Sequence, residues 1–393
     1  GLSGGLGGRF DLTSSASGSF TGKVTLGAKA HSFSGKWKTD VNGVNAPEAT
    51  VTIPRKSPLS DLIVTFTADP ANHVISIGLV DDGIAPASFT AWKKRWGTAM
   101  LPAEKTDLDT YKGYYTFGMD PPVPVVTPPV TPSEVHPQGM GYGAFTVSST
   151  GSLTIAGRLP DNVSYTASTF CGPAGQVLVF KALHSNKGSL LGTLDITQGT
   201  MAFVPPYGDN TLGGTVSYLR PAITGTIYKT GFPPADLTAV GGRYVPPAAG
   251  TLIFGLTDDG VTPNARLLFT DGGITGTTTD DLGTLTSPDI NVRVKTTGGI
   301  ALPSPNPRST TLTYNKTTGS FSGRSILLDV NPAKPGTNIT RYLYYYGIIF
   351  RDTPSTVRGY GEFLLSRRPD AMSAQTILTT DKLSGQVVFE KLP

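Results

Sequence analysis

The chain has 393 residues, a formal net charge of +4 and only 15% charged residues, while Gly (48) and Pro (32) are abundant. Gly and Pro disfavour helix interiors by about 1 and about 3 kcal/mol per residue, and 38% hydrophobic residues are too many for a disordered chain. The densest basic run, residues 93–95, is too short to follow a phosphate backbone. No stretch reaches the roughly 18–20 apolar residues of a membrane-spanning helix. Composition predicts an all-β protein that neither binds nucleic acid nor spans a membrane.

Residues 1–110 form the first predicted β unit, which we expect to be incomplete. Apolar and polar residues alternate over residues 8–80 between Ser/Gly turns, as in a β-meander. Residues 87–96 fit a helix, because Phe89, Trp92 and Trp96 have helical spacing, and also fit a strand. The β surroundings favour the strand.

A second unit is predicted over residues 111–200, packed with the first as one module. Residues 120–137 are proline-rich and therefore predict an exposed loop, in which His136 would be solvated. Cys171 follows a strand and is expected to be buried. Three proline pairs between residues 201 and 250 predict a connection to a C-terminal β module at 251–393, whose strongest strand is 341–350. The expected architecture is a tandem of antiparallel β-barrel or β-sandwich modules with little helix.

One strand-turn-strand phrase recurs along the chain. Residues 17–23 (SGSFTGK) reappear at 318–324 (TGSFSGR) and more loosely at 150–158 (TGSLTIAGR). Tyr-rich strands at 111–117 and 342–346 are each followed by Gly-Tyr-Gly-x-Phe, whereas the first unit has only its Gly-x-Phe part, at Gly8 to Leu12. A strand without a neighbour exposes a sheet edge. We therefore predict an incomplete edge at Gly8, Phe10 and Leu12, completed by an upstream segment or by another subunit.

The order of several motifs supports a resemblance. Residues 18–23 and 33–37 are followed by Lys187-Gly-Ser-Leu-Leu-Gly192 and by Tyr218-Leu-Arg-Pro221. Over nearly its whole length the chain resembles uncharacterised β-rich repeat modules of very large secreted or surface proteins of environmental bacteria. The resemblance implies an extracellular or cell-surface setting and transfers no catalytic residue. The truncated first unit departs from the pattern.

The residues that usually carry chemistry are scattered. The single cysteine excludes an intrachain disulfide, and the four histidines have no metal-ligand spacing. Two of the three Asp pairs, at 81–82 and 258–259, precede Gly and fit turns. No catalytic residue, metal or cofactor is predicted.

Aromatic side chains are the remaining candidates for contacts with a partner or a glycan. Trp92 and Trp96 flank the basic run, and Tyr342, Tyr344 and Tyr346 alternate along one predicted strand. The alternative is that alternate members face the core or form cross-strand pairs. That alternative is favoured for the tyrosines.

These observations predict a non-enzymatic structural or assembly module of an extracellular bacterial surface protein or filament. It would associate through β-edges and aromatic patches with copies of itself or with other parts of a longer polypeptide. A carbohydrate-binding or adhesin module that contacts polysaccharide is the second hypothesis. A glycan-acting enzyme is the third.

Overall fold

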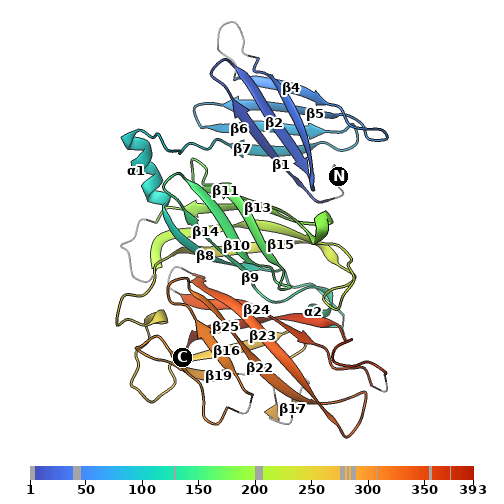
Figure 1. The fold of residues 1–393 in the computed structure, drawn as a ribbon, viewed down its shortest axis with the longest axis vertical. Helices are drawn as coiled ribbons and strands as arrows, with labels where there is room; N and C mark the ends of the chain where they lie inside the picture. Colours follow the sequence, from blue (N-terminus) through green and yellow to red (C-terminus); the bar gives the residue numbers. More distant parts are fainter. Residues whose placement is uncertain are drawn as a thin grey trace.

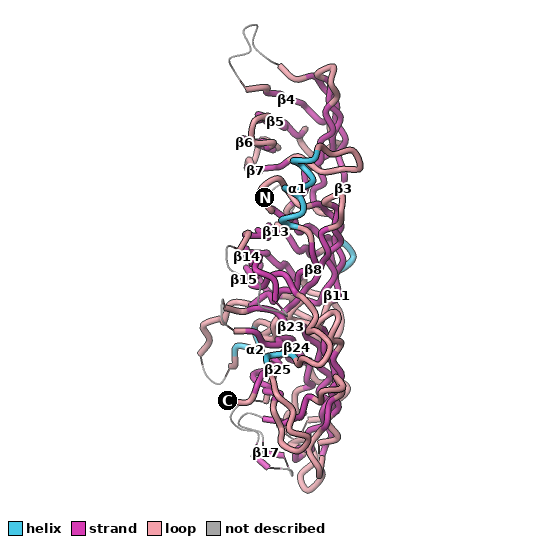
Figure 2. The backbone as a smooth tube through the Cα atoms, turned by 90° about the vertical axis from the view of Figure 1, so that its left-hand side faces the viewer, coloured by secondary structure: helices cyan, strands magenta, loops and turns pink. Residues whose placement is uncertain are grey.

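Three β units are stacked in chain order along the long axis of the molecule (Figure 1). The computed structural model describes residues 5–38, 46–127, 130–199, 207–274, 279–280, 283–284, 289–306, 308–353, 356–371 and 373–393. Strands predominate, with 54% of residues against 6% in helices, so the all-β prediction is confirmed. In the perpendicular view, β4 to β7 and β13 to β15 lie along one side and β3 and β11 along the other (Figure 2).

The first unit is a meander of seven strands. A three-stranded sheet, β1-β2-β3, adjoins a four-stranded sheet, β4-β5-β6-β7, through a bridge between Lys38 and Glu48. Phe20, Val64 and Phe66 pack between the two sheets. The strands are β1 (Gly8–Ser14), β2 (Ser19–Leu26), β3 (Lys29–Lys36), β4 (Glu48–Ile53), β5 (Leu62–Asp69), β6 (Val74–Asp81) and β7 (Ala87–Trp92).

The second unit is a nearly closed eight-stranded barrel in the order β11-β10-β9-β8-β15-β14-β13-β12. A bridge between Cys171 and Val177 brings its two end strands together. The elements are α1 (Pro102–Tyr111), β8 (Gly113–Asp120), α2 (Pro132–Val135), β9 (Gly141–Val147), β10 (Ser152–Arg158), β11 (Ser164–Phe170), β12 (Gln176–Leu183), the 3-10 turn η1 (His184–Asn186), β13 (Gly188–Thr197), β14 (Tyr207–Arg220) and β15 (Phe232–Tyr244).

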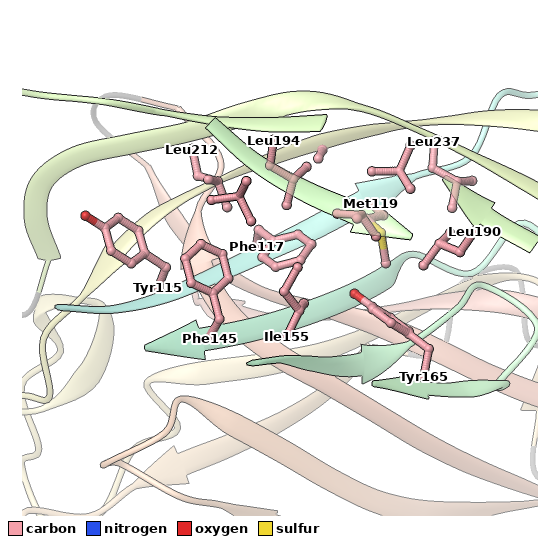
Figure 3. Packing of buried hydrophobic residues seen from close by; sticks show 14 of the residues in the cluster. Tyr115, Phe117, Met119, Phe145, Ile155, Tyr165, Leu190, Leu194, Leu212 and Leu237 are labelled. Atoms are coloured by element: carbon pink, nitrogen blue, oxygen red, sulfur yellow. The ribbon is translucent and has the colours of Figure 1, made fainter. Parts of the chain in front are cut away.

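The core of the second unit is built from alternate residues of facing strands. Tyr115, Phe117 and Met119 of β8 point inward beside Phe145, opposite leucines from the other side of the barrel (Figure 3). All three β8 side chains are at most 1% exposed. This strand therefore supplies a continuous row of large side chains to the barrel interior.

The third unit is a larger sheet in the order β18-β17-β22-β23-β24-β25-β16-β19-β20, with β21 on β22. Phe269, Phe363 and Phe389 are fully buried in its core. Its elements are η2 (Ile253–Gly255), β16 (Ala265–Asp271), β17 (Thr279–Asp280), β18 (Gly283–Thr284), β19 (Asp289–Val294), β20 (Ile300–Ala301), β21 (Thr311–Tyr314), β22 (Ser320–Val330), β23 (Asn338–Arg351), β24 (Val357–Ser366) and β25 (Lys382–Lys391).

The recurring sequence phrase forms a hairpin turn in each unit; the turns of the first two units have the same hydrogen bonds, and that of the third unit is one residue longer. Gly18, Gly151 and Gly319 have φ of 77°, 70° and 72°, a region that glycine enters without steric cost. The carbonyl of each glycine accepts a hydrogen bond from the following strand, donated by the amides of Trp37, Cys171 and Ile349 respectively. The turn thus fixes three strands at once.

The structure differs from the sequence-based expectations in two segments. Residues 207–220 and 232–244, expected within a connection, form β14 and β15 of the second unit. The buried residues of β15 alternate although Pro233 and Pro234 lie at its start. In the region 87–96, the predicted strand ends at Trp92, and the helix α1 begins only at Pro102. Leu108 and Tyr111 attach this helix to the core of the second unit.

Candidate functional site

The first unit has an open edge along β1. Among the described strands, β1 pairs with β2 alone. The Gly27 amide donates to the Gly7 carbonyl, and the Ser15 amide donates to the Ser19 carbonyl. The backbone N–H and C=O groups of the odd-numbered residues of β1 therefore point toward β2. Because backbone groups alternate between the two edges of an antiparallel strand, the N–H and C=O groups of Gly8, Phe10 and Leu12 point away from β2. These are the residues at which the sequence predicts an incomplete edge.

A second open edge lies along β7. This strand pairs with β6 alone in the described part of the chain. The amide of Lys93, just beyond the strand, donates to the carbonyl of His73. The register shift between β6 and β7 places two residues of β6, Ser76 and Ile77, opposite Thr90. The extra residue belongs to β6, so β7 keeps its alternation and the backbone groups of Trp92 and Thr90 point away from β6. The first and last strands of the meander, β1 and β7, therefore both direct backbone N–H and C=O groups into the gap between them.

A largely apolar pocket of about 520 Å³ occupies this gap. Phe10, Leu26 and Phe89 line it from the first unit. The rings of Phe10 and Phe89 are 4.6 Å apart between centroids, so side chains bridge the gap where backbone hydrogen bonds do not. The wall contributed by the second unit consists of Thr169, Phe170, Leu178 and Leu191. The pocket is consequently a feature of the junction between the first two units.

In the second unit the corresponding gap is filled by β8. This strand pairs antiparallel with β9 on one side and with β15 on the other. While its inner face enters the barrel core, its outer face contacts the third unit: Tyr114 Oη donates to the Thr318 carbonyl (3.1 Å) and Thr116 Oγ1 to the Ile349 carbonyl (2.8 Å). One strand thus closes a barrel and joins two units.

Apolar packing completes the junction between the second and third units. Met140, Ile348 and Phe350 are buried there against the partly buried Tyr142 and Tyr360. Between the first and second units, Lys94 Nζ donates to Ser152 Oγ (2.7 Å) and Arg9 Nη1 to the Ser168 carbonyl (3.3 Å). Both of these polar bonds are exposed, and the open pocket lies in the same junction.

The two candidate tryptophans have different environments. Trp92 is half-buried and lines the pocket, against Gly172 of the second unit. Trp96 is only 1% exposed and packs against Tyr111 in the core of the second unit, with 5.7 Å between ring centroids. The prediction of Trp96 as a surface contact is therefore wrong. The chain after β7 turns into the neighbouring core, and its largest side chain is buried there.

The tyrosines of β23 alternate between the two faces of the strand. Tyr342 and Tyr344 are 52% and 47% exposed and stack on each other, with 6.2 Å between centroids. Tyr345 between them is fully buried. Tyr346 is half-buried, with the Arg158 guanidinium 4.0 Å above its ring, beside a polar hollow of about 400 Å³. Glycan binding by the exposed pair stays a prediction.

Sequence reasoning missed a buried polar cluster in the junction of the second and third units. Glu362 of β24 is fully buried, and neither carboxylate oxygen has a hydrogen-bond partner among the described residues. Burial raises the pKa of this carboxyl well above its ordinary value, although Arg158 opposes the shift. The segment before β9 covers it, since the Gly139 amide donates to Ser384 Oγ and the Met140 amide to the Gly361 carbonyl. No local motif marks this tertiary arrangement.

His136 belongs to the same region and is not solvated, contrary to expectation. Its side chain is 7% exposed and lies 4.6 Å from Phe232 between ring centroids. Burial lowers the pKa of the imidazole. The proline-rich segment folds back over the barrel end, where the Tyr228 hydroxyl donates to the Ser133 carbonyl. This contact explains why a segment without a strand pattern is partly buried.

Cys171 and the described His, Asp and Glu side chains are the remaining groups that could carry chemistry. Cys171 is buried as predicted, and burial raises the pKa of its thiol to about 12, so the nucleophilic thiolate is disfavoured. Within the described ranges, no group of three or more His, Cys, Asp or Glu side chains is arranged to hold a metal ion. Among the helices described above, none has the length and apolar character needed to cross a bilayer.

The open edge of the first unit, with its pocket and its filled counterpart in the second unit, is therefore the strongest candidate site. Searches against protein-family models, curated proteins and solved structures found no match for this chain.

Proposed function

We propose that this chain is a structural module that joins polypeptides, itself included, through the open edge of its first β unit. The single observation that carries the proposal is the gap between β1 and β7, whose equivalent in the second unit is filled by β8. The proposed setting is an extracellular or cell-surface assembly, such as a filament or sheath. The motif resemblance supports this setting.

The physical basis is the addition of a strand to a sheet. Peptide groups along an open edge form main-chain hydrogen bonds with an added strand, while alternate side chains enter pockets and give specificity. Both components are present, because Gly8, Phe10 and Leu12 offer backbone groups and the adjoining pocket is lined by apolar side chains. Association would also remove from water the exposed edge that otherwise favours uncontrolled aggregation.

Replacement of Thr90 by Pro tests the proposal. The Thr90 amide faces the gap, so proline removes a donor from the open edge without removing a hydrogen bond to β6. We expect the wild-type chain to form high-mass particles at increasing concentration, seen by light scattering and negative-stain microscopy, and Thr90→Pro to reduce them at least tenfold. Thr90→Val keeps the amide and serves as the matched control, which should assemble like the wild type.

Circular dichroism and thermal unfolding establish that each variant is folded before assembly is compared. A wild-type chain that stays a monodisperse monomer at high concentration would contradict the proposal. Equal assembly of folded Thr90→Pro and wild type would show that another surface is responsible.

A further inference from the structure

We infer that the gap between β1 and β7 is an acceptor site for one extended strand of another polypeptide, with a side-chain pattern derived from β8. The inference rests on the proposed function and specifies the partner's chemistry. The donor strand carries large apolar side chains at alternate positions, with one small residue among them, and runs antiparallel to both β1 and β7.

The direction follows from the correspondence of the first two units. The hairpin turns at Gly18 and Gly151 have the same hydrogen bonds: the Ser15 amide donates to the Ser19 carbonyl, and the Ser148 amide donates to the Ser152 carbonyl. This aligns β1 with β9, and the meander order then aligns β7 with β15. Since β8 is antiparallel to both β9 and β15, an added strand in the equivalent place is antiparallel to β1 and β7. The six residues of β7 set its paired length.

The side-chain pattern follows from the same alignment. Phe117 of β8 lies opposite Gly143, which is so close that a Cβ there would be 2.5 Å from the Phe117 ring. The turn places Phe10, a large residue, at the position of Gly143, so the sequence match of Gly8-x-Phe10 with Gly143-x-Phe145 is out of register by two residues. The donor residue opposite Phe10 must therefore be small. The flanking inward positions, filled in β8 by Tyr115 and Met119, remain large and apolar.

The outer face of the donor has a defined surface as well. In the second unit the outer face of β8 rests on the third unit, through Tyr114 and Thr116. In the equivalent place, the donor's outer face meets the second-unit wall of the pocket, formed by Thr169, Phe170, Leu178 and Leu191. A bound donor would therefore join the first two units as β8 joins the second and third.

A peptide fits this gap better than an apolar small molecule. The backbone groups of Gly8, Phe10, Leu12 and Thr90 project toward it from both sides. Burial of peptide groups without hydrogen-bond partners is unfavourable, and a ligand with only apolar surface would leave them without partners. An extended strand supplies donors and acceptors at the matching spacing on both edges.

We assign the donor to another polypeptide and not to a described strand of this chain, because the described strands are already engaged. Each described strand already pairs with at least one neighbour in its own sheet. The strand with the right pattern, β8, has Tyr115, Phe117 and Met119 buried in its own barrel. Its transfer to a second copy would open that barrel and expose this row of side chains.

The test uses fluorescent peptides and the intact chain. The first peptide has the sequence of residues 113–120 with Phe117→Ala, which provides the small residue opposite Phe10. The control peptide also carries serine in place of Tyr115 and Met119. We expect saturable 1:1 binding of the first peptide by fluorescence anisotropy, at least tenfold tighter than the control. Equal binding of both peptides, or no binding, would overturn the inference.

The register between the donor and β1 can be tested by exchanging the large and the small residue of one facing pair, Phe10 of the chain and position 117 of the peptide. Wild type should prefer the Phe117→Ala peptide over the unaltered 113–120 sequence, and Phe10→Ala should reverse this order. Ala91→Phe places a ring in the pocket and should abolish binding, whereas Ala30→Phe makes the same change at an exposed position of β3 and should not. An order that does not reverse in folded Phe10→Ala would overturn the proposed register, and with it the inference.

The experiments distinguish failure of the proposed assembly function from failure of the proposed acceptor site. Peptide binding by a chain that stays monomeric supports the acceptor site and contradicts self-assembly. Edge-dependent particles that neither bind the peptide nor dissociate in its presence support assembly and overturn the predicted donor pattern.

Discussion

Glu362 illustrates how a single residue can make the junction of two units sensitive to pH. Its carboxyl is covered by the segment before β9 and faces Arg158, Asp161 and the Tyr142 ring. Desolvation disfavours the charged form more than the attraction of Arg158 favours it, so the pKa is raised. A raised pKa of an acid means that the folded state binds its proton more tightly than the unfolded state does. The associated stability is present below about pH 4.5 and is lost as the pH rises through the folded-state pKa.

We predict that Glu362→Gln reduces this loss of stability at high pH, because glutamine stays neutral. Urea unfolding between pH 4.5 and 9 should show a smaller fall in the free energy of unfolding for the variant than for the wild type. Glu48→Gln changes an exposed side chain of β4 and should keep the wild-type profile. Parallel profiles for wild type and Glu362→Gln would show that the carboxyl is not held in its protonated form.

The environments of some single residues could be predicted from the sequence, and those of others could not. The prediction of an incomplete edge at Gly8, Phe10 and Leu12 came from comparing repeated phrases, and these residues lie on a strand with one described neighbour. The different environments of Trp92 and Trp96 were not predictable, since they depend on the path of the chain into another unit. The burial of Glu362 and His136 depends on contacts between distant segments, which no local pattern records.

At the scale of elements, the hairpin turn is the most transferable feature of the sequence. Gly18 has φ of 77°, and a Cβ added there would meet nothing within 4 Å. The requirement for glycine is therefore conformational and not steric. Gly97 also lies in open space, but its φ is outside the left-handed region.

These two glycines form a matched pair. We predict that Gly18→Ala destabilises the first unit by about 1 kcal/mol, because a side chain disfavours the left-handed conformation. Gly97→Ala should be neutral or stabilising by up to about 1 kcal/mol, since alanine restricts the unfolded chain. Denaturant unfolding of both variants checks the prediction, and an equal effect of the two substitutions would contradict it.

The turns were predictable from Gly and Ser at fixed spacing, whereas some longer elements were not. β14 and β15 lie among proline pairs, and their assignment as strands depends on the barrel that they complete. Helix α1 has few apolar residues, and it is held by the contacts of Leu108 and Tyr111. Tertiary packing therefore outweighed local preference in these segments.

At the scale of the whole molecule, the three units differ in how firmly they are joined. The second and third units share a buried apolar junction and the outer face of β8. The first unit has a smaller core and an open pocket in its junction. We therefore expect it to unfold independently and at a lower temperature than the rest.

Calorimetry with two core substitutions tests this expectation. Val64 in the first unit and Val216 in the second are both fully buried. Replacement of either by alanine should cost about 2 kcal/mol, but Val64→Ala should lower only the first transition and Val216→Ala only the second. The donor-like peptide should raise the first transition. A single transition that both substitutions lower equally would show that the units unfold together.

The gap between β1 and β7 lies part-way along the stack and not at its tip, and the neighbouring strands run across the long axis (Figure 1). A strand held there would enter and leave at the flanks of the molecule. Each chain would therefore be bound side-on at this gap, by a strand that belongs to another polypeptide. A partner with several such strands would bridge neighbouring stacks, and the ratio of donor strands to gaps, more than the affinity of each pair, would then determine how extensive the network becomes.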